Sequence, residues 1–298
     1  MMPPSSTSTA MAPSSSSISS PTAAPAVAGE KPPLLELVNL WKRFGDGPAQ
    51  VTAVSNVNLK IREGEFVCLV GPSGCGKSTL FNMVGGLLPA DDDGSILMHG
   101  RPMADGALLG KVSFMPQRDL LFAWRNVVDN AILGLEVEGT PKAAARARAL
   151  EMLPDFGLKG FEKHYPHQLS GGMRQRVALM RTFLFERDMI LLDEPFGALD
   201  ALTRAMMQRW LLDIWARYRR TVLFITHDID EAIFLGDRVV VMTARPGTIK
   251  CDEVIELPRP RDAGIVTSPE FIDIKRRLLG AIEEEARKSF VSTTGGAG

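Results

Sequence analysis

A glycine-rich segment of nine residues, 71–79, constrains the fold of this chain more than any other part of the sequence. It reads Gly71-Pro72-Ser73-Gly74-Cys75-Gly76-Lys77-Ser78-Thr79 and fits the pattern G-x-x-x-x-G-K-[ST]. A short apolar run, residues 66–70, precedes it, and apolar residues at helical spacing follow it. A buried parallel strand, a glycine loop and a helix in this order are the setting of a phosphate-binding loop. The sequence therefore predicts an α/β fold with this phosphate loop at the end of a strand.

Each part of the phosphate loop has a task in holding a nucleotide. The glycines let the backbone curl, so that successive N–H groups point inward at phosphate oxygens. We expect Lys77 to reach the β- and γ-phosphates and Ser78 to ligate Mg²⁺. A glycine-rich turn that binds nothing is disfavoured, because all four fixed positions and both flanking elements are present. Cys75 lies near a helix start, where thiols become more reactive, so alkylation is expected to weaken nucleotide binding.

A second apolar run, residues 189–192, ends in the adjacent carboxylates Asp193 and Glu194. Asp193 can hold Mg²⁺, directly or through water. Glu194 points to the other side and can take a proton from an attacking water. The alternative, a solvated acidic pair, is disfavoured by the phosphate loop in the same chain. His227 follows the apolar run 221–225 at the edge where α/β sheets place ligands, which favours a polar contact with the γ-phosphate over a structural role.

A second anion-binding helix start is predicted at Ser170. Ser170 is a good N-cap, and Gly171 and Gly172 leave the first amides bare. This site has no lysine of its own. One explanation is that it completes the phosphate site of another subunit.

Two apolar features allow two interpretations each. Phe44 can stack on an adenine ring or belong to the core, and its spacing alone favours the core. The apolar loop, residues 120–124, reads Leu-Leu-Phe-Ala-Trp and can either be covered by a partner or pack locally in a helical subdomain. Just before it, Pro116 ends a strand and presents Gln117 at the strand end.

Periodicity predicts the remaining elements. Strands are expected at 35–38, 57–61, 95–98, 112–115, 221–225, 238–242 and 250–257. Residues 127–160 are predicted to be helical, with Pro141 in the first turn of a helix over 143–153, and a further helix is expected over 201–218. Five apolar residues mark a final amphipathic helix: Phe271, Ile274, Leu278, Ile282 and Phe290.

Composition limits the functions open to the chain. Apolar residues make up 45% and charged residues 23% of the 298 positions, as in ordinary globular proteins. The net charge of −1 gives no electrostatic case for binding nucleic acid. No apolar run approaches the about 18 residues needed to span a bilayer. Three cysteines without metal-binding spacing suggest a reducing compartment, the cytosol. Residues 1–33 are rich in Ser, Thr, Pro and Ala and are predicted to be disordered.

Taken together, these motifs resemble those of the ATP-binding subunit of an ABC transporter. The match covers about residues 34–260 and is carried by the phosphate loop, by Gln117 as the Q-loop glutamine, and by the signature Leu169-Ser170-Gly171-Gly172-Met173. The strand ending in Asp193-Glu194, the D-loop ending in Asp200 and the switch histidine His227 also match. Residues 193–204 and 116–127 resemble importer subunits for nitrate, sulfonates, taurine and thiamine precursors, although Ala123 stands where that group commonly has Pro.

The resemblance implies a P-loop NTPase core with a mostly parallel sheet, an N-terminal antiparallel β subdomain and an inserted helical subdomain at about 119–185. Residues 261–298 would form a helical extension. ATP and Mg²⁺ are the implied cofactors, with Ser78, Gln117 and Asp193 at the metal and Phe44 against the adenine. Glu194, His227 and Gln117 are the implied catalytic residues.

The resemblance also implies partners. Two ATPase subunits, identical or paired, would pack head to tail, so that Ser170, Gly171, Gly172 and Asp200 of one act on ATP held by the other. The apolar loop lies where relatives receive the coupling helix of a transmembrane permease. An extracytoplasmic solute-binding protein would act indirectly, and the chain would lie peripherally at the cytoplasmic face of the plasma (inner) membrane.

Three other functions share part of this chemistry. A soluble ABC-type ATPase acting on ribosomes or DNA usually carries two nucleotide domains or a coiled-coil insertion, and this chain shows one domain and no heptad stretch. An exporter ATPase is disfavoured by the importer-like residues 196–204 and by the absence of fused membrane spans. A phosphate-loop kinase is disfavoured by the signature and by His227.

Overall fold

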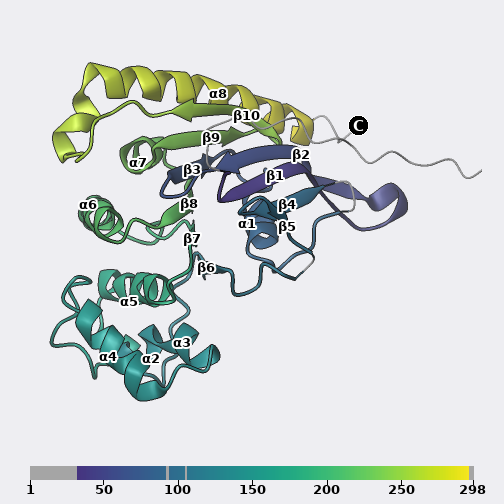
Figure 1. The fold of residues 1–298 in the computed structure, drawn as a ribbon. Helices are drawn as coiled ribbons and strands as arrows, with labels where there is room; N and C mark the ends of the chain where they lie inside the picture. Colours follow the sequence, from purple (N-terminus) through teal and green to yellow (C-terminus); the bar gives the residue numbers. More distant parts are fainter. Residues whose placement is uncertain (1–31, 92–93, 105, 295–298) are drawn as a thin grey trace, which may run out of the picture. The chain divides into compact units, whose positions relative to one another are not determined.

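The computed structural model describes residues 32–91, 94–104 and 106–294. Nearly all of the predicted disordered tail, residues 1–31, lies outside the described residues. Within the described part, two β-sheets and eight α-helices account for the fold (Figure 1).

A six-stranded sheet forms the centre, in the order β10-β9-β3-β8-β7-β6. All neighbours are parallel except β10, which is antiparallel to β9. Apolar runs form these strands because both faces of the sheet are covered. The strands are β3 (Phe66–Val70), β6 (Val112–Met115), β7 (Met189–Asp193), β8 (Thr221–Ile225), β9 (Arg238–Met242) and β10 (Ile249–Val254).

A four-stranded antiparallel sheet, in the order β2-β1-β4-β5, lies N-terminal in the chain. It contains β1 (Leu35–Phe44), β2 (Val51–Ile61), β4 (Ser95–Met98) and the short β5 (Arg101–Pro102). Strands β1 and β2 are longer than predicted, so Trp41 and Phe44 belong to β1. The 3₁₀ turn η1 (Gly47–Ala49) connects the two strands. Strand β5 was not predicted, because two residues carry no periodicity.

The core has two parts, one on each face of the six-stranded sheet. Side chains of a strand alternate between faces, and β3 shows this directly. Phe66, Cys68 and Val70 pack into a cluster with the helical elements, whereas Val67 and Leu69 pack with α1 (Lys77–Val84) and the antiparallel sheet. The sheet is therefore the middle layer of the fold.

The helical segment between β6 and β7 begins with three short helices. Helices α2 (Val127–Ala131), α3 (Leu133–Val137) and α4 (Lys142–Met152) contact α5 (Gly171–Leu184), and Figure 1 shows them gathered against it. The prediction of helix over 127–160 was wrong in two respects: the segment forms three separate helices, and the last of them ends at Met152. The backbone leaves the helical region at Ile132, and Pro141 is an N-cap with extended ψ that cannot continue a helix. The 3₁₀ turn η2 (Pro166–Gln168) precedes α5.

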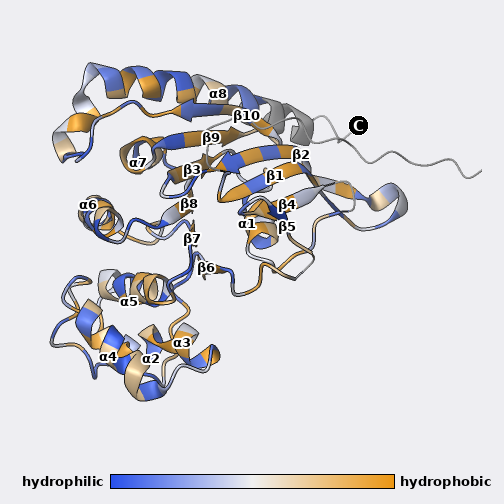
Figure 2. Cartoon of the chain, in the orientation of Figure 1, coloured by the Kyte–Doolittle hydropathy of each residue, from blue (hydrophilic) through white to orange (hydrophobic). Residues whose placement is uncertain are grey.

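The remaining helices are α6 (Ala201–Tyr218), α7 (Ile229–Leu235) and α8 (Pro269–Thr294), with the 3₁₀ turn η3 (Ala263–Thr267) before α8. The predicted amphipathic final helix is confirmed over its first part, since Phe271, Ile274 and Leu278 are buried, Ile282 is half-buried, and Figure 2 shows hydrophilic and hydrophobic residues on α8. The side chain of Phe290 lies outside the described part of the structure. Ion pairs of Lys250 with Glu285 and of Arg277 with Glu253 fasten α8 to β10. No helix among the described residues is long and apolar enough to cross a membrane.

Candidate functional site

The phosphate loop lies between the end of β3 and the start of α1, as predicted. Gly76 is the N-cap of α1 with φ of 102°, and Gly74 has φ of 75°. A side chain at Gly76 would meet the carbonyl oxygen of Ala53 at 2.7 Å. Only glycine combines this positive φ with so close an approach of β2. The curled loop exposes its tip, since Ser73 and Gly74 are exposed.

Lys77 is buried at the first turn of α1, where its Nζ donates to the carbonyl oxygens of Gly71 at 2.8 Å and Pro72 at 3.1 Å. The ammonium group is thereby held against the loop itself. Cys75 is 1% exposed, with its Sγ 3.8 Å from Lys77 Nζ. A thiol reagent reaches Cys75 only if the loop opens, so the expected sensitivity to alkylation stays a prediction.

Three predicted catalytic side chains meet at the carboxyl edge of the six-stranded sheet. One oxygen of Glu194, Oε2, accepts from Gln117 Nε2 at 3.2 Å and lies 3.2 Å from His227 Nδ1. Gln117 follows β6, Glu194 follows β7 and His227 follows β8, so neighbouring parallel strands deliver all three. Glu194 has φ of 44°, and this left-handed turn directs the chain away from the strand.

Asp193 is the last residue of β7 and lies beside this cluster. Burial and, to a smaller extent, the charge of Glu194 raise the pKa of Asp193, the charge of Lys77 opposes them, and the pKa is about 6 as a result. The Asp193 carboxyl group therefore interacts electrostatically with both the phosphate-loop lysine and the neighbouring acid. Asp193, Ser78 and Gln117 offer oxygen donors only, and such hard donors suit Mg²⁺. The predicted metal ligands thus fit the ion chemically.

The anion-binding helix start predicted at Ser170 lies next to the start of α6, where the D-loop residue Asp200 is found. Ser170 caps α5, since its Oγ accepts from the N–H of Met173 at 3.3 Å, and Asp200 caps α6 by accepting from the N–H of Thr203 at 3.0 Å. A side chain at Gly172 would meet Thr203 Cγ2 at 3.4 Å. Within the described part of the chain, no hydrogen bond or ion pair joins either start to Lys77 or Glu194.

Phe44 lies at the end of β1, opposite Val51. It is 43% exposed, and Lys42 Nζ lies 5.9 Å from its ring centroid. The interpretation of Phe44 as a core residue is therefore wrong. An exposed ring at the end of a strand is free to stack on a flat partner.

Much of the apolar loop is exposed and does not pack against the helical segment. Leu120 is 57% and Trp124 is 74% exposed, and the ring of Trp124 stacks on Phe122 with 4.9 Å between centroids. Local packing thus covers only part of the loop.

Sequence reasoning missed the residues that support the site from outside. Gly247, between β9 and β10, donates its N–H to Ala53 O at 3.0 Å, and a side chain there would meet Cys75 O at 2.0 Å. The dipeptide Pro246-Gly247 was a turn signal that could have drawn attention to this position. Asn130, a fully buried amide in a short helix, was also missed.

Comparisons with known proteins agree with this geometry. The family model described as ABC transporter matches residues 54–197. An uncharacterized ABC transporter ATP-binding protein of Methanocaldococcus jannaschii is 44% identical over 256 residues, which cover 86% of this chain and 93% of that protein. The aliphatic sulfonates import ATP-binding protein of Bacillus licheniformis is 41% identical over 254 residues (85% and 96%). The taurine import ATP-binding protein of Rhizobium johnstonii is 43% identical over 233 residues (76% and 88%).

Solved structures give the same answer for the fold. A dimeric structure of a bacterial ABC transporter cassette superposes with a TM-score of 0.64 at 32% identity, covering 75% of this chain and 100% of that chain. The same cassette in a dimeric post-hydrolysis state is bound to ADP and Pi, with equal scores. The predicted P-loop NTPase core, with its mostly parallel sheet and antiparallel β subdomain, is confirmed. The chain therefore belongs to the ABC transporter family, among the ATP-binding subunits that are ATPases coupled to transport.

Proposed function

We propose that this chain is the ATP-hydrolysing subunit of an importer for a small sulfonate such as taurine, or for a related solute. The observation that carries the hydrolytic part is the junction of Gln117, Glu194 and His227 at one sheet edge. The relatives named for aliphatic sulfonate and taurine import support the solute class.

The phosphate loop and α1 bind the nucleotide in this proposal. Its backbone N–H groups and Lys77 hold the phosphates, and Phe44 stacks on the adenine. Ser78, Asp193 and Gln117 would hold Mg²⁺, which neutralises developing phosphate charge when it is bound. Asp193 must be ionised for this role.

Glu194 orients and deprotonates the attacking water. Its Oε2 already engages Gln117 and His227, so the carboxylate is held at a fixed place on the sheet edge. His227 also reaches outward, since its side chain is 60% exposed, and it contacts the γ-phosphate. The base, its positioning partners and the phosphate contact thus come from three adjacent strands.

A second copy of the chain, or a paired subunit, completes the site. The dimeric cassette structures support a dimer. In this dimer the two subunits pack head to tail, so that the helix starts at Ser170, Gly171 and Gly172 and at Asp200 of one close onto ATP held by the other. ATP then joins the two subunits, and hydrolysis releases them. The exposed apolar loop contacts a transmembrane permease, which places the chain at the cytoplasmic face of the membrane.

The hydrolytic role is tested with Glu194→Gln. General bases contribute roughly 10²–10⁴-fold in rate, so this variant should bind ATP, form a stable dimer and lose most turnover. Glu256→Gln, an exposed acid elsewhere, serves as the control and should hydrolyse ATP at the wild-type rate. Wild-type turnover by Glu194→Gln would remove Glu194 from this role.

The transport role is tested by purifying the tagged chain from its native membranes in mild detergent and identifying its partners by mass spectrometry. A multi-span permease should come with it. Calorimetric titration of the accompanying solute-binding protein with taurine, an alkanesulfonate and nitrate then decides the solute class. Recovery of ribosomal or DNA-repair proteins without a permease would overturn the importer function.

A further inference from the structure

The apolar loop adopts one defined shape, although it is exposed. It follows Gln117 of the catalytic cluster directly and leads into α2. Leu120 has φ of 44°, a left-handed conformation that a branched side chain adopts only when its surroundings impose it. Something in the protein must therefore hold the backbone of this loop.

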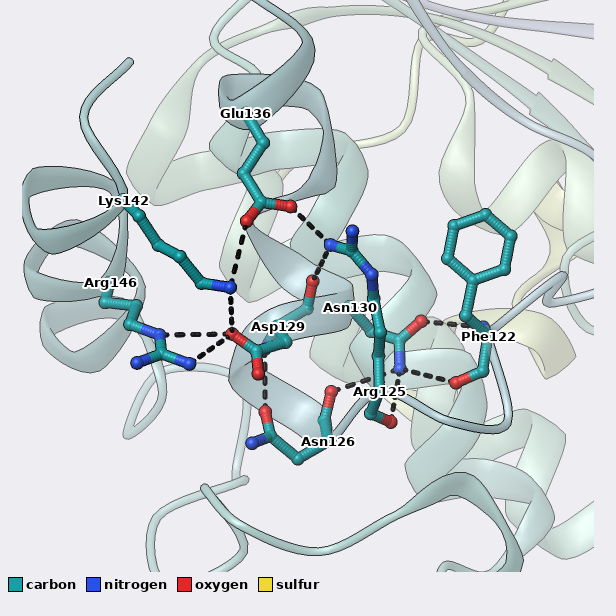
Figure 3. A network of polar contacts seen from close by, with 8 residues as sticks. All are labelled: Phe122, Arg125, Asn126, Asp129, Asn130, Glu136, Lys142 and Arg146. Carbon is teal, nitrogen blue, oxygen red and sulfur yellow. Dashed lines mark hydrogen bonds and ion pairs between the residues drawn. The ribbon is translucent and has the colours of Figure 1, made fainter. Parts of the chain in front are cut away.

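Asn130 of α2 is the main support. Its side chain is fully buried, and Figure 3 shows it directed at the backbone that carries Phe122. Its Oδ1 accepts from the N–H of Phe122 at 2.8 Å. Its Nδ2 donates to three carbonyl oxygens, at 3.1, 2.8 and 3.1 Å, which belong to Phe122, Arg125 and Asn126. A carboxylate could accept here but not donate, and an apolar side chain could do neither.

A second support comes from α5. Arg181 donates to the carbonyl oxygens of Asp119 at 2.7 Å and Leu120 at 3.0 Å. Arg174 donates to the carboxylate of Asp119 at 3.2 Å. Because Ser170 is the N-cap of α5, these bonds connect the apolar loop to the helix start that is proposed to act on the partner's ATP.

An ion-pair network holds the helix that carries Asn130. Arg125 pairs with Glu136 and donates to the carbonyl oxygen of Asp129 at 3.2 Å. Arg146 pairs with the Asp129 carboxylate at 2.7 Å, and Lys142 pairs with Glu136 at 3.4 Å (Figure 3). These contacts join α2, α3 and α4, so the base of the apolar loop moves with the helical segment as a unit.

We propose that Asn130 is a positioning residue for the permease contact. It presets the apolar loop so that Leu120 and the stacked pair Phe122–Trp124 meet an apolar segment of the permease without a further cost of ordering. It also keeps the apolar loop at a fixed position between Gln117, which precedes the loop in the chain, and α5, which donates hydrogen bonds to it. The inference rests on the proposed transport function and names the residue through which nucleotide state and permease contact are linked.

The test compares Asn130→Asp with Thr182→Val. The first keeps the acceptor for Phe122 N–H and removes all three donated bonds. The second removes a buried hydrogen bond of α5, from Thr182 Oγ1 to Ala178 O at 2.9 Å, that does not touch the loop, and it controls for a general loss of stability. Arg181→Lys is a second variant in case Asn130→Asp fails to fold, since a lysine loses the paired bonds to Asp119 and Leu120.

Three readouts separate positioning from stability. The isolated Asn130→Asp chain should bind ATP and hydrolyse it within about twofold of wild type. Amide hydrogens of residues 119–125 should exchange faster than in wild type. In the purified complex with the permease, the stimulation of ATPase by the loaded solute-binding protein should fall at least tenfold, whereas Thr182→Val should keep it.

The outcomes are distinct. Full stimulation in Asn130→Asp and Arg181→Lys would overturn this inference and leave the transport function intact. An equal loss in Thr182→Val would also overturn it, because stability alone would then explain the effect. Failure of the wild-type chain to associate with any permease would overturn the proposed function and this inference together.

Discussion

Arg261 holds the end of α7, and replacing it with methionine should cost the protein a large part of its stability. Its side chain is buried, and the guanidinium donates to backbone carbonyl oxygens of two segments. Nη1 lies 2.8, 3.1 and 2.7 Å from those of Ile233, Phe234 and Gly236, and Nη2 lies 3.4 and 3.3 Å from those of Ile255 and Leu257. The first three belong to the end of α7 and the residue after it, where helix carbonyls lack intrahelical partners.

The magnitude follows from the two shortest bonds. Burial and the nearby charge of Arg259 lower the pKa of Arg261 to about 10, which is still well above neutral pH, so the guanidinium stays charged. Hydrogen bonds from a charged group contribute about 1.5–3 kcal/mol each, so losing two should reduce the free energy of unfolding by about 3–6 kcal/mol. The free energy of unfolding of a whole domain is about 5–15 kcal/mol. Each kcal/mol lost from it lowers the Tm of a large domain by about 2–4 °C.

Scanning calorimetry of Arg261→Met should therefore show a Tm lower by roughly 6–24 °C. Arg276→Met is the matched control, because Arg276 is exposed on α8 and its ion pair among the described residues is with Asp273 at 2.7 Å. Such a surface pair contributes at most about 1 kcal/mol. If Arg261→Met melted within 2 °C of wild type, water or other donors would satisfy these carbonyls, and the assignment of Arg261 as the support of α7 would be wrong.

Two further predictions concern other buried contacts. Burial raises the pKa of Glu231, so the folded state is penalised when the carboxyl ionises, and this penalty is absent below the unfolded pKa and grows as pH rises. Glu231→Gln should raise Tm more at pH 8 than at pH 5, and an equal gain at both would contradict the argument. Gly247→Ala should lower ATP affinity at least tenfold in a fluorescent-nucleotide titration, because its Cβ would displace the phosphate loop at Cys75. Gly280→Ala on α8, with open space around it, should bind ATP normally.

The strand, loop and helix at 66–84 could be predicted because their signals are local. The cluster of Gln117, Glu194 and His227 could also be predicted, because each follows an apolar run and the carboxyl ends of parallel strands share one edge. The exposure of Phe44 could not be predicted, since spacing does not show that the end of β1 extends beyond its pairing with β4. Asn130 and Arg261 act through hydrogen bonds between their side chains and irregular backbone, and no periodic pattern marks such contacts.

The order of strands has a consequence for how the protein is made. β3 leads into the phosphate loop, yet its two sheet neighbours, β8 and β9, begin only at Thr221 and Arg238. Ribosomes add about 5–20 residues per second, so roughly 8–30 s pass between the synthesis of β3 and that of β8, its first neighbour in the sheet. Throughout this interval the five apolar side chains of Phe66–Val70 have neither of their neighbouring strands to pair with. The nascent chain must shield them by transient collapse or by a chaperone, and the nucleotide site is completed only after β8 and the residues that follow it have been made.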